Sequence, residues 1–261
     1  MSASPMVTIN PDEQFPHLKN APIVEAIIDF RARVEADWKE PEITEALKSL
    51  LPDYPKKLSM SGFQQEFTLG PGIAPEAKTI DKGWTGLRCE NENGLQIAQF
   101  SRDGLIFARL RPYEQWERFA GEALRLWKIF VQVGKPADIQ RMGVRFVNRM
   151  NLPPTEVPIE NYLDPAPRGT KDLEIPLQHF FHQDTFGVTG HPYAIRLIRT
   201  IQQEQRPDSQ SFGIILDIDV FTTQSFEPGL DTLDRRLREM RWLKNKVFFG
   251  SIASRALEGF R

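Results

Sequence analysis

The sequence predicts an α+β protein built from two tandem units, each with the element order β-α-β-β-β-α. Three observations predict this class: apolar residues alternate in several short segments, two turn dipeptides separate some of those segments, and two long amphipathic stretches follow them. Helices and strands do not alternate as a parallel sheet requires. We therefore expect curved antiparallel sheets, each packed on a long C-terminal helix in a helix-grip-like arrangement.

The first unit is expected to span residues 1–139. Its elements are, in order, a strand at 23–33, a helix opened by Glu40-Pro41, a β-meander within 63–111, and a helix over 116–130. Two turns in the meander are legible, at Asn93-Gly94 and Asp103-Gly104. Both dipeptides tolerate the positive φ of tight hairpins, so strands are expected on either side of them.

The second unit is expected to span residues 140–261. Its elements are a strand at 141–150, a helical turn at 159–163, strands at 180–188, 193–202 and 212–221, a long helix over 230–247 and a terminal helix at 254–260. The first strands of the two units are expected to join edge to edge, because pairing removes an open sheet edge. Glu25 and Asp29 would then lie within cross-strand reach of Arg141 and Arg145.

Composition restricts the class of protein. The chain has 261 residues, of which 40% are hydrophobic and 26% are charged, which is typical of a folded globular protein. Thirty-three basic and 35 acidic residues give a net charge of −2, so the chain lacks the strong positive charge of a dedicated nucleic-acid binder. Nucleic acid is therefore not favoured as a partner, although Arg241, Lys244 and Lys246 form a basic stripe that leaves it open.

Localisation follows from what the sequence lacks. The single cysteine, Cys89, cannot form an internal disulfide or a cysteine-based metal site. The first residues contain prolines and acids rather than the apolar core of a signal peptide, and apolar runs are far shorter than a membrane span of about 20 residues. We expect a cytoplasmic protein without a membrane span, and the absence of phosphate-loop and catalytic motifs predicts no cofactor.

An arginine ladder is the first candidate site. Arg141, Arg145 and Arg149 are spaced by four in a predicted strand and therefore project from one face. Guanidinium groups match phosphates and carboxylates, so the ladder, with Asn148 beside it and Gly143 leaving room, predicts a site for an anionic ligand or a nucleic-acid backbone. The alternative is ordinary pairing with acidic residues on a neighbouring strand.

Carboxylates on predicted strands give two further candidates. Glu25 would be a buried acid, a clamp for a cationic group, or a partner of the arginine ladder, and pairing is favoured because an unpaired buried carboxylate is costly. Asp217 and Asp219 alternate within a strand and emerge on one face. They would bind Mg²⁺, divide acid and base roles, or form a solvated face near Arg196 or Arg199.

The histidines cluster once, at His179, His182 and His191 together with Asp184. Metal-binding pairs prefer a spacing of two on a strand or four on a helix, and a spacing of three suits neither. We therefore expect no metal site. Cys89 lies in a predicted strand without a histidine nearby in the sequence, which is typical of a buried residue without a chemical role.

Two aromatic stripes, over 116–130 and 230–249, are expected to be the core faces of the two long helices. A curved sheet with a helix across it can also enclose a pocket lined with aromatic residues. At the end of the second stripe, Trp242, Phe248 and Phe249 are candidates for a homodimer or protein-partner surface, because aromatic residues anchor interfaces.

Three stretches resemble a sporadically distributed family of uncharacterised prokaryotic proteins of about this length. They are residues 16–26 (PHLKNAPIVEA), residues 141–149 (RMGVRFVNR) and residues 242–260, with Asn245 among them. The resemblance implies no particular activity or catalytic residues. The scattered occurrence of the family is similar to that of mobile-element, defence or toxin–antitoxin proteins, which implies a second component.

Three functions remain open at the level of sequence. The leading hypothesis is a non-enzymatic protein-interaction or binding module of a two-component system, because no nucleophile, base and metal set converges. The alternative is a small-molecule or nucleotide-binding protein with a pocket between sheet and long helix, and with Arg145 and Glu25 at its polar end. A hydrolase or nuclease built on Asp217 and Asp219 is the third.

Overall fold

The computed structural model describes residues 5–70, 73–153, 158–167, 177–206 and 209–261. The strands are β1 (Ile23–Arg31), β2 (Lys56–Gly70), β3 (Ile73–Glu90), β4 (Gln96–Ser101), β5 (Gly104–Leu110), β6 (Arg141–Asn151), β7 (Phe181–Gly187), β8 (Ala194–Arg206) and β9 (Ser209–Thr222). The helices are α1 (Glu40–Leu50), α2 (Trp116–Gly134), α3 (Leu230–Ser251) and α4 (Ser254–Glu258), with a 3-10 turn, η1, at Ile159–Asn161. The predicted α+β class is confirmed.

All the strands of the described residues join in a single nine-stranded antiparallel sheet, in the order β2-β3-β4-β5-β1-β6-β9-β8-β7. The centre of the sheet is the pair β1–β6, in which Ile28 lies opposite Val144 and Asp29 lies opposite Gly143. The pairing expected between the two first strands is therefore present. It buries two strand edges that would otherwise be open to aggregation.

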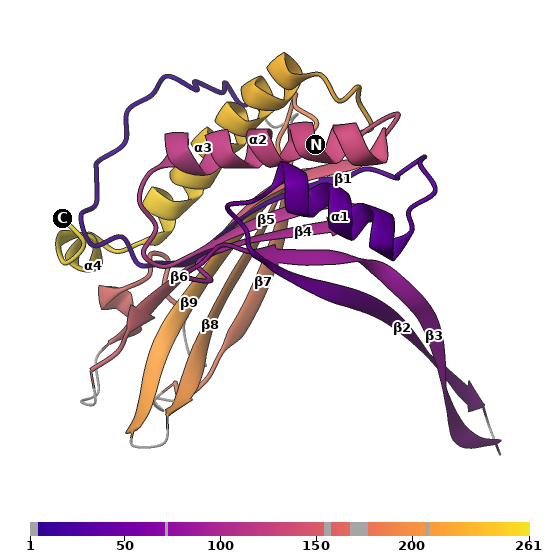
Figure 1. Cartoon of the computed structure of the whole chain (residues 1–261). Coiled ribbons are helices and arrows are strands. Elements are labelled where there is room, and N and C mark those ends of the chain that lie inside the picture. Colours follow the sequence, from indigo (N-terminus) through magenta and orange to yellow (C-terminus); the bar gives the residue numbers. More distant parts are fainter. Residues whose placement is uncertain (1–4, 71–72, 154–157, 168–176, 207–208) are drawn as a thin grey trace.

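The sheet arches beneath its helices (Figure 1). α1, α2 and α3 lie on one side of it, while the long β2–β3 ribbon descends at one end and β7, β8 and β9 descend at the other. We call the side that carries the helices the helix-covered face and the other side the open face. Because successive strand residues point to opposite faces, each strand contributes to both.

Local sequence explains where several elements begin and turn. Pro41 lies in the first turn of α1, where a missing N–H costs no hydrogen bond. Gly94 has a φ of 70°, the left-handed conformation expected of the Asn-Gly turn. A side chain at Gly104 would lie 2.0 Å from the carbonyl oxygen of Phe30, so the predicted Asp-Gly turn also needs glycine for the close approach of β5 to β1.

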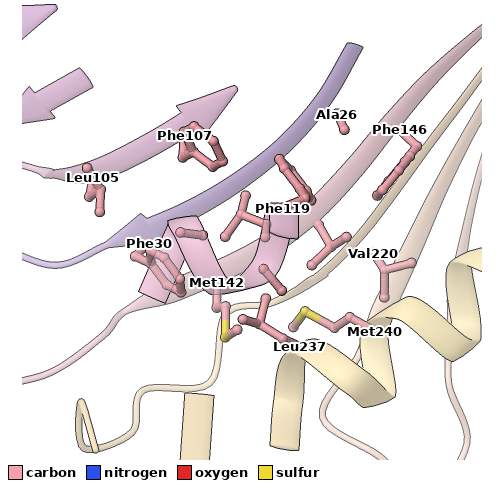
Figure 2. Packing of buried hydrophobic residues seen from close by; sticks show 14 of the residues in the cluster. Ala26, Phe30, Leu105, Phe107, Phe119, Met142, Phe146, Val220, Leu237 and Met240 are labelled. Carbon is pink, nitrogen blue, oxygen red and sulfur yellow. The ribbon is translucent and has the colours of Figure 1, made fainter. Parts of the chain in front are cut away.

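The core lies on the helix-covered face (Figure 2). Ala26, Ile28 and Phe30 of β1 are completely buried, and they alternate with the side chains of the open face. Aromatic contacts tie the sheet to α2: the ring of Phe119 lies 5.4 Å from that of Phe107 and 5.9 Å from that of Phe146. From α3, Leu237, Met240 and other buried residues complete the same cluster.

The expected meander at 63–111 is longer than the sequence indicated. β2 begins at Lys56 and pairs with β3 along most of its length, down to the pair Gly70 and Ile73. β4 supports β3 only between Gly86 and Glu90, so the rest of the ribbon has no third strand. Polar residues and glycines interrupt the alternation there, which is why periodicity did not reveal the full strands. No helix among the described residues is long and apolar enough to cross a membrane.

Candidate functional site

The arginine ladder lies on the open face, where aspartates of the neighbouring strands engage it. Arg141 contacts Asp29 and also donates to Asp219, with its Nη2 3.0 Å from Oδ2. Arg145 forms a two-pronged pair with Asp217, at 2.8 Å from Nε to Oδ1 and 2.5 Å from Nη2 to Oδ2. The sequence left open an anion-binding site or pairing with acidic residues of a neighbouring strand, and the geometry of Arg141 and Arg145 is that of pairing.

The aspartates are the buried partners of these pairs. Asp29, Asp217 and Asp219 are each less than a tenth exposed, so each needs a cation to offset the loss of water. Burial raises the pKa of Asp219, and the guanidinium of Arg141 opposes that rise. Asp217 and Asp219 do share a face, as predicted, but their contacts with Arg145 and Arg141 are those of ion pairs rather than of metal ligands.

Other predicted residues of this region separate between the two faces. Glu25 is half-buried on the open face, opposite Val147, and stabilises the charge of Arg145 at longer range. Arg149 packs over Gly213 and donates from Nε to Asn151 at 3.2 Å. Asn148 lies on the helix-covered face instead, because it follows Val147 by one residue in the same strand.

A cavity of about 620 Å³ lies on the helix-covered face, beside the second half of α3. It is walled by four parts of the chain: the irregular segment 11–23, the start of α2 with the residues before it, Asn148 of β6, and the helix residues 241–249. Residues from all three stretches that resemble the prokaryotic family line it: His17, Asn148 and Asn245 are examples. Segments far apart in the sequence therefore meet at this cavity. Its volume is in the range usual for small-molecule sites.

Lys244 is the central charged group of the cavity. Its ammonium nitrogen lies 4.2 Å from the centre of the Phe146 ring, and no carboxylate of the described residues pairs with it. Burial and, to a smaller extent, the positive charge of Arg241 together lower the pKa of Lys244 to about 7. An unpaired, desolvated amine in a cavity is a common sign of a functional site.

Two further side chains define the polar end of the cavity. Asn148 is buried and donates from Nδ2 to the carbonyl oxygens of Leu216 and Phe146, at 2.9 Å and 3.3 Å. Both bonds use the amide nitrogen, which leaves the amide oxygen of this cavity-lining residue as an acceptor. Arg241 stacks on Trp116 with its guanidinium 5.6 Å from the ring centre, and it donates to Glu117 at 3.2 Å. Together with Lys244 these groups offer donors and one acceptor.

The segment 11–19 closes the outer side of the cavity as a strap. Glu13 accepts hydrogen bonds from Lys246 and from the indole of Trp242, both at 2.6 Å. These two bonds lower the pKa of the Glu13 carboxyl. Phe15 stacks on Phe249 with ring centres 5.6 Å apart and planes 8° apart. The strap is thus held to α3 by one carboxylate and one aromatic stack.

The aromatic residues expected at a partner surface serve the chain itself. Trp242 and Phe248 are each less than a tenth exposed, and Phe249 is covered by the strap through Phe15. Phe248 and Phe249 also line the cavity. All three therefore contact other parts of the same chain: Trp242 donates to Glu13, whereas Phe248 and Phe249 wall the cavity.

The histidine cluster does not converge. His179 lies against Phe212, His182 lies against Phe180, and His191 bonds to the carbonyl oxygen of Val7. No group of three or more potential metal ligands forms within the described ranges. Cys89 is completely buried, and burial raises the pKa of its thiol to about 11, which leaves it protonated and unreactive.

Sequence reasoning missed the role of Lys244, which was grouped with the basic stripe on the wet face of the helix. The spacing contained a signal. Leu237 and Met240 are buried, and steps of four from Met240 lead to Lys244 and then to the buried Phe248. A lysine on the apolar stripe of a helix points inward, because residues three and four apart share a face.

The chain was also compared with known proteins. No family model matches it, and no curated protein matches it significantly. The resemblance to the sporadic prokaryotic family therefore stays a prediction.

Proposed function

We propose that the protein binds a small molecule in the cavity between the strap, the sheet and α3. The observation that carries the proposal is the ammonium group of Lys244, which faces the cavity and has the ring of Phe146 as its neighbour instead of a carboxylate. Lys244 is half-buried, and a charged group without a partner is costly to withdraw from water. A ligand that accepts a hydrogen bond from it would remove that cost.

The lining indicates the kind of ligand. Phe15, Tyr113 and Trp116 belong to the walls, and aromatic walls favour a ligand with an apolar or planar body. Lys244 and Arg241 favour an oxygen-rich polar group on that ligand, such as a carbonyl, carboxylate or phosphate. The polar end differs from the sequence prediction, because Arg145 and Glu25 lie on the open face and do not line the cavity.

Native mass spectrometry of the purified protein, followed by titration with a panel of aromatic acids and oxo acids, tests this proposal. We expect at least one compound of the panel to bind, and Lys244→Met to weaken it at least tenfold, or about 1.4 kcal/mol. The matched control is Lys128→Met, which changes an exposed lysine of α2 and should leave the affinity unchanged. Equal affinity in Lys244→Met and wild type would contradict the proposal.

A protein-interaction module of a two-component, defence or toxin–antitoxin-like system is the second candidate. It is supported by edge strand β7, where Phe181 is 65% exposed and Phe186 is 50% exposed. Exposed aromatics beside an unpaired strand edge suit the addition of a partner strand. Co-expression with the product of a neighbouring gene tests it: a stoichiometric complex that is lost in a Phe181→Ser, Phe186→Ser double variant would support it, and a homodimer is the other outcome.

We also propose that residues 1–139 and 140–261 are two helix-grip-like repeats that form one body. The strand orders support this, because β1 is followed outward by β5, β4, β3 and β2, and β6 by β9, β8 and β7, so the halves match except for the additional strand β2. In each half a long helix, α2 or α3, follows the last strand.

We also propose that the protein belongs to the sporadic prokaryotic family, a proposal supported by the three resembling stretches, which meet at the cavity. We propose a cytoplasmic location, which the single, buried cysteine supports.

A further inference from the structure

We infer that Lys244 is a nucleophilic amine that captures an aldehyde or ketone as a reversible imine, the carbonyl compound also carrying an acidic group that Arg241 binds. This inference rests on the proposed function, since it names the ligand class of the same cavity. It makes the site one of covalent capture rather than of simple charge pairing.

The placement of Lys244 supports a reactive amine over an anion anchor. A lysine that only anchors an anion gains from staying protonated, whereas Lys244 lines the cavity without a carboxylate partner and has the cationic Arg241 three residues before it on the same face of α3. Desolvation and a neighbouring cation are the two devices by which proteins keep a lysine amine neutral. Arg241 lines the same cavity and pairs with the exposed Glu117 through Nη1, so its remaining guanidinium donors can bind the acidic group of the ligand.

The chemistry balances without any further reactant. The lone pair of Nζ adds to the carbonyl carbon, and the electron pair of the C=O bond moves to oxygen. The carbonyl oxygen then leaves as water with the two hydrogens of the amine, and a C=N bond remains. No oxidant or reductant takes part, and addition of water reverses the step.

The access route is consistent with this ligand. The strap closes the cavity through the Glu13 bonds and the stack of Phe15 on Phe249. Neither contact involves Lys244, so movement of the strap can admit a ligand without disturbing the amine.

Reductive labelling of the full chain tests the inference, with pyridoxal 5′-phosphate as the probe because it combines an aldehyde, an aromatic ring and an acidic group. After brief treatment at pH 7 and borohydride reduction, peptide mapping should find Lys244 labelled at least about tenfold more than any other lysine. The labelling of Lys244 should rise with a midpoint near pH 7, whereas the other lysines should rise above about pH 9.

Two variants make the result specific. Lys244→Arg keeps the positive charge but cannot form the imine, so selective labelling should disappear. Lys128→Arg changes an exposed lysine of α2 that does not line the cavity, so the labelling of Lys244 in this variant should equal that of wild type. Labelling spread over surface lysines, or selective labelling that survives Lys244→Arg, would overturn the inference. If an acid of the earlier panel still binds in that case, the proposed binding function stands while imine capture fails.

Discussion

The two faces of the central strands β1 and β6 carry charge in opposite ways. On the open face, Arg141 and Arg145 are matched by three buried aspartates at hydrogen-bonding distance. On the helix-covered face, Lys244 lies over Phe146 of the same strand β6 and has no acidic partner in the described part of the chain. Arg141 and Arg145, which the sequence singled out as a binding site, are thus neutralised by acidic partners. Lys244, which the sequence did not single out, is not.

This contrast teaches where binding capacity remains. An ion pair whose partners already satisfy each other gains little from a ligand, because the ligand must first displace the existing partner. An unpaired amine in a cavity gains the full interaction, because nothing has to be displaced but water. Charge on a strand is therefore a weak indicator of a binding site until its cross-strand neighbours are known.

The largest effect is expected when the ion pairs of the open face are broken. Arg141→Ala leaves both Asp29 and Asp219 without their shared cation, so we expect a loss of about 3–5 kcal/mol in the free energy of unfolding. Urea denaturation followed by tryptophan fluorescence measures it. Arg31→Ala is the control: Arg31 is half-exposed and 3.9 Å from Asp29, and its loss should cost less than about 1 kcal/mol. Equal losses in the two variants would contradict the contrast between the faces.

The second-largest effect is expected when the unpaired charge of Lys244 is removed. In the folded protein the pKa of Lys244 falls from 10.5 to about 7, so between these values the unfolded chain binds more protons and stability rises with pH. Lys244→Met lacks this dependence. At pH 6 we expect the variant to be more stable than wild type by about 2 kcal/mol, because wild type must keep Lys244 protonated in the fold. Water in the cavity screens part of this cost, so the gain is smaller than the full pKa shift would give. The advantage should shrink toward pH 10, and a constant difference from pH 6 to pH 10 would refute the explanation.

The smallest effect concerns the strap that separates the cavity from solvent. Glu13→Gln removes the charge that Lys246 and Trp242 bind, so amide hydrogen exchange within 11–19 should become roughly threefold faster at pH 7. The pKa of Glu13 is lowered in the fold, so wild type should approach the variant as the pH falls through that pKa. Glu92→Gln, an exposed change in a hairpin turn, should leave exchange in the strap unchanged.

Much of the fold was predictable from local pattern. The Asn93-Gly94 and Asp103-Gly104 turns lie where expected, with β4 between them, because turn chemistry depends on adjacent residues alone. The join between β1 and β6 was also expected, since both strands alternate apolar and charged residues. The extent of the β2–β3 ribbon was not, because its residues lack a consistent apolar face.

The candidate site was less predictable than the fold. Alternation placed Asp217 and Asp219 on one face but could not choose Arg145 and Arg141 as their partners over Arg196 and Arg199, because register between distant strands is set by the whole sheet. The structure places Arg196 opposite Asp219 and turns Arg199 to Asp184 at 2.9 Å. The register of the sheet thus decided which arginine pairs with which aspartate.

The sequence by itself determined the class of the protein, most of its strands and helices, and which side chains share a face of those strands, since these depend on the periodicity of neighbouring residues. Only the tertiary structure decided that Arg141 and Arg145 are paired with aspartates and that Lys244 faces a cavity beneath the strap. Those facts depend on contacts between residues far apart in the sequence: Glu13 with Lys246, Phe146 with Lys244, and Arg145 with Asp217. Such contacts arise from burial and strand register over long separations, which local sequence does not encode.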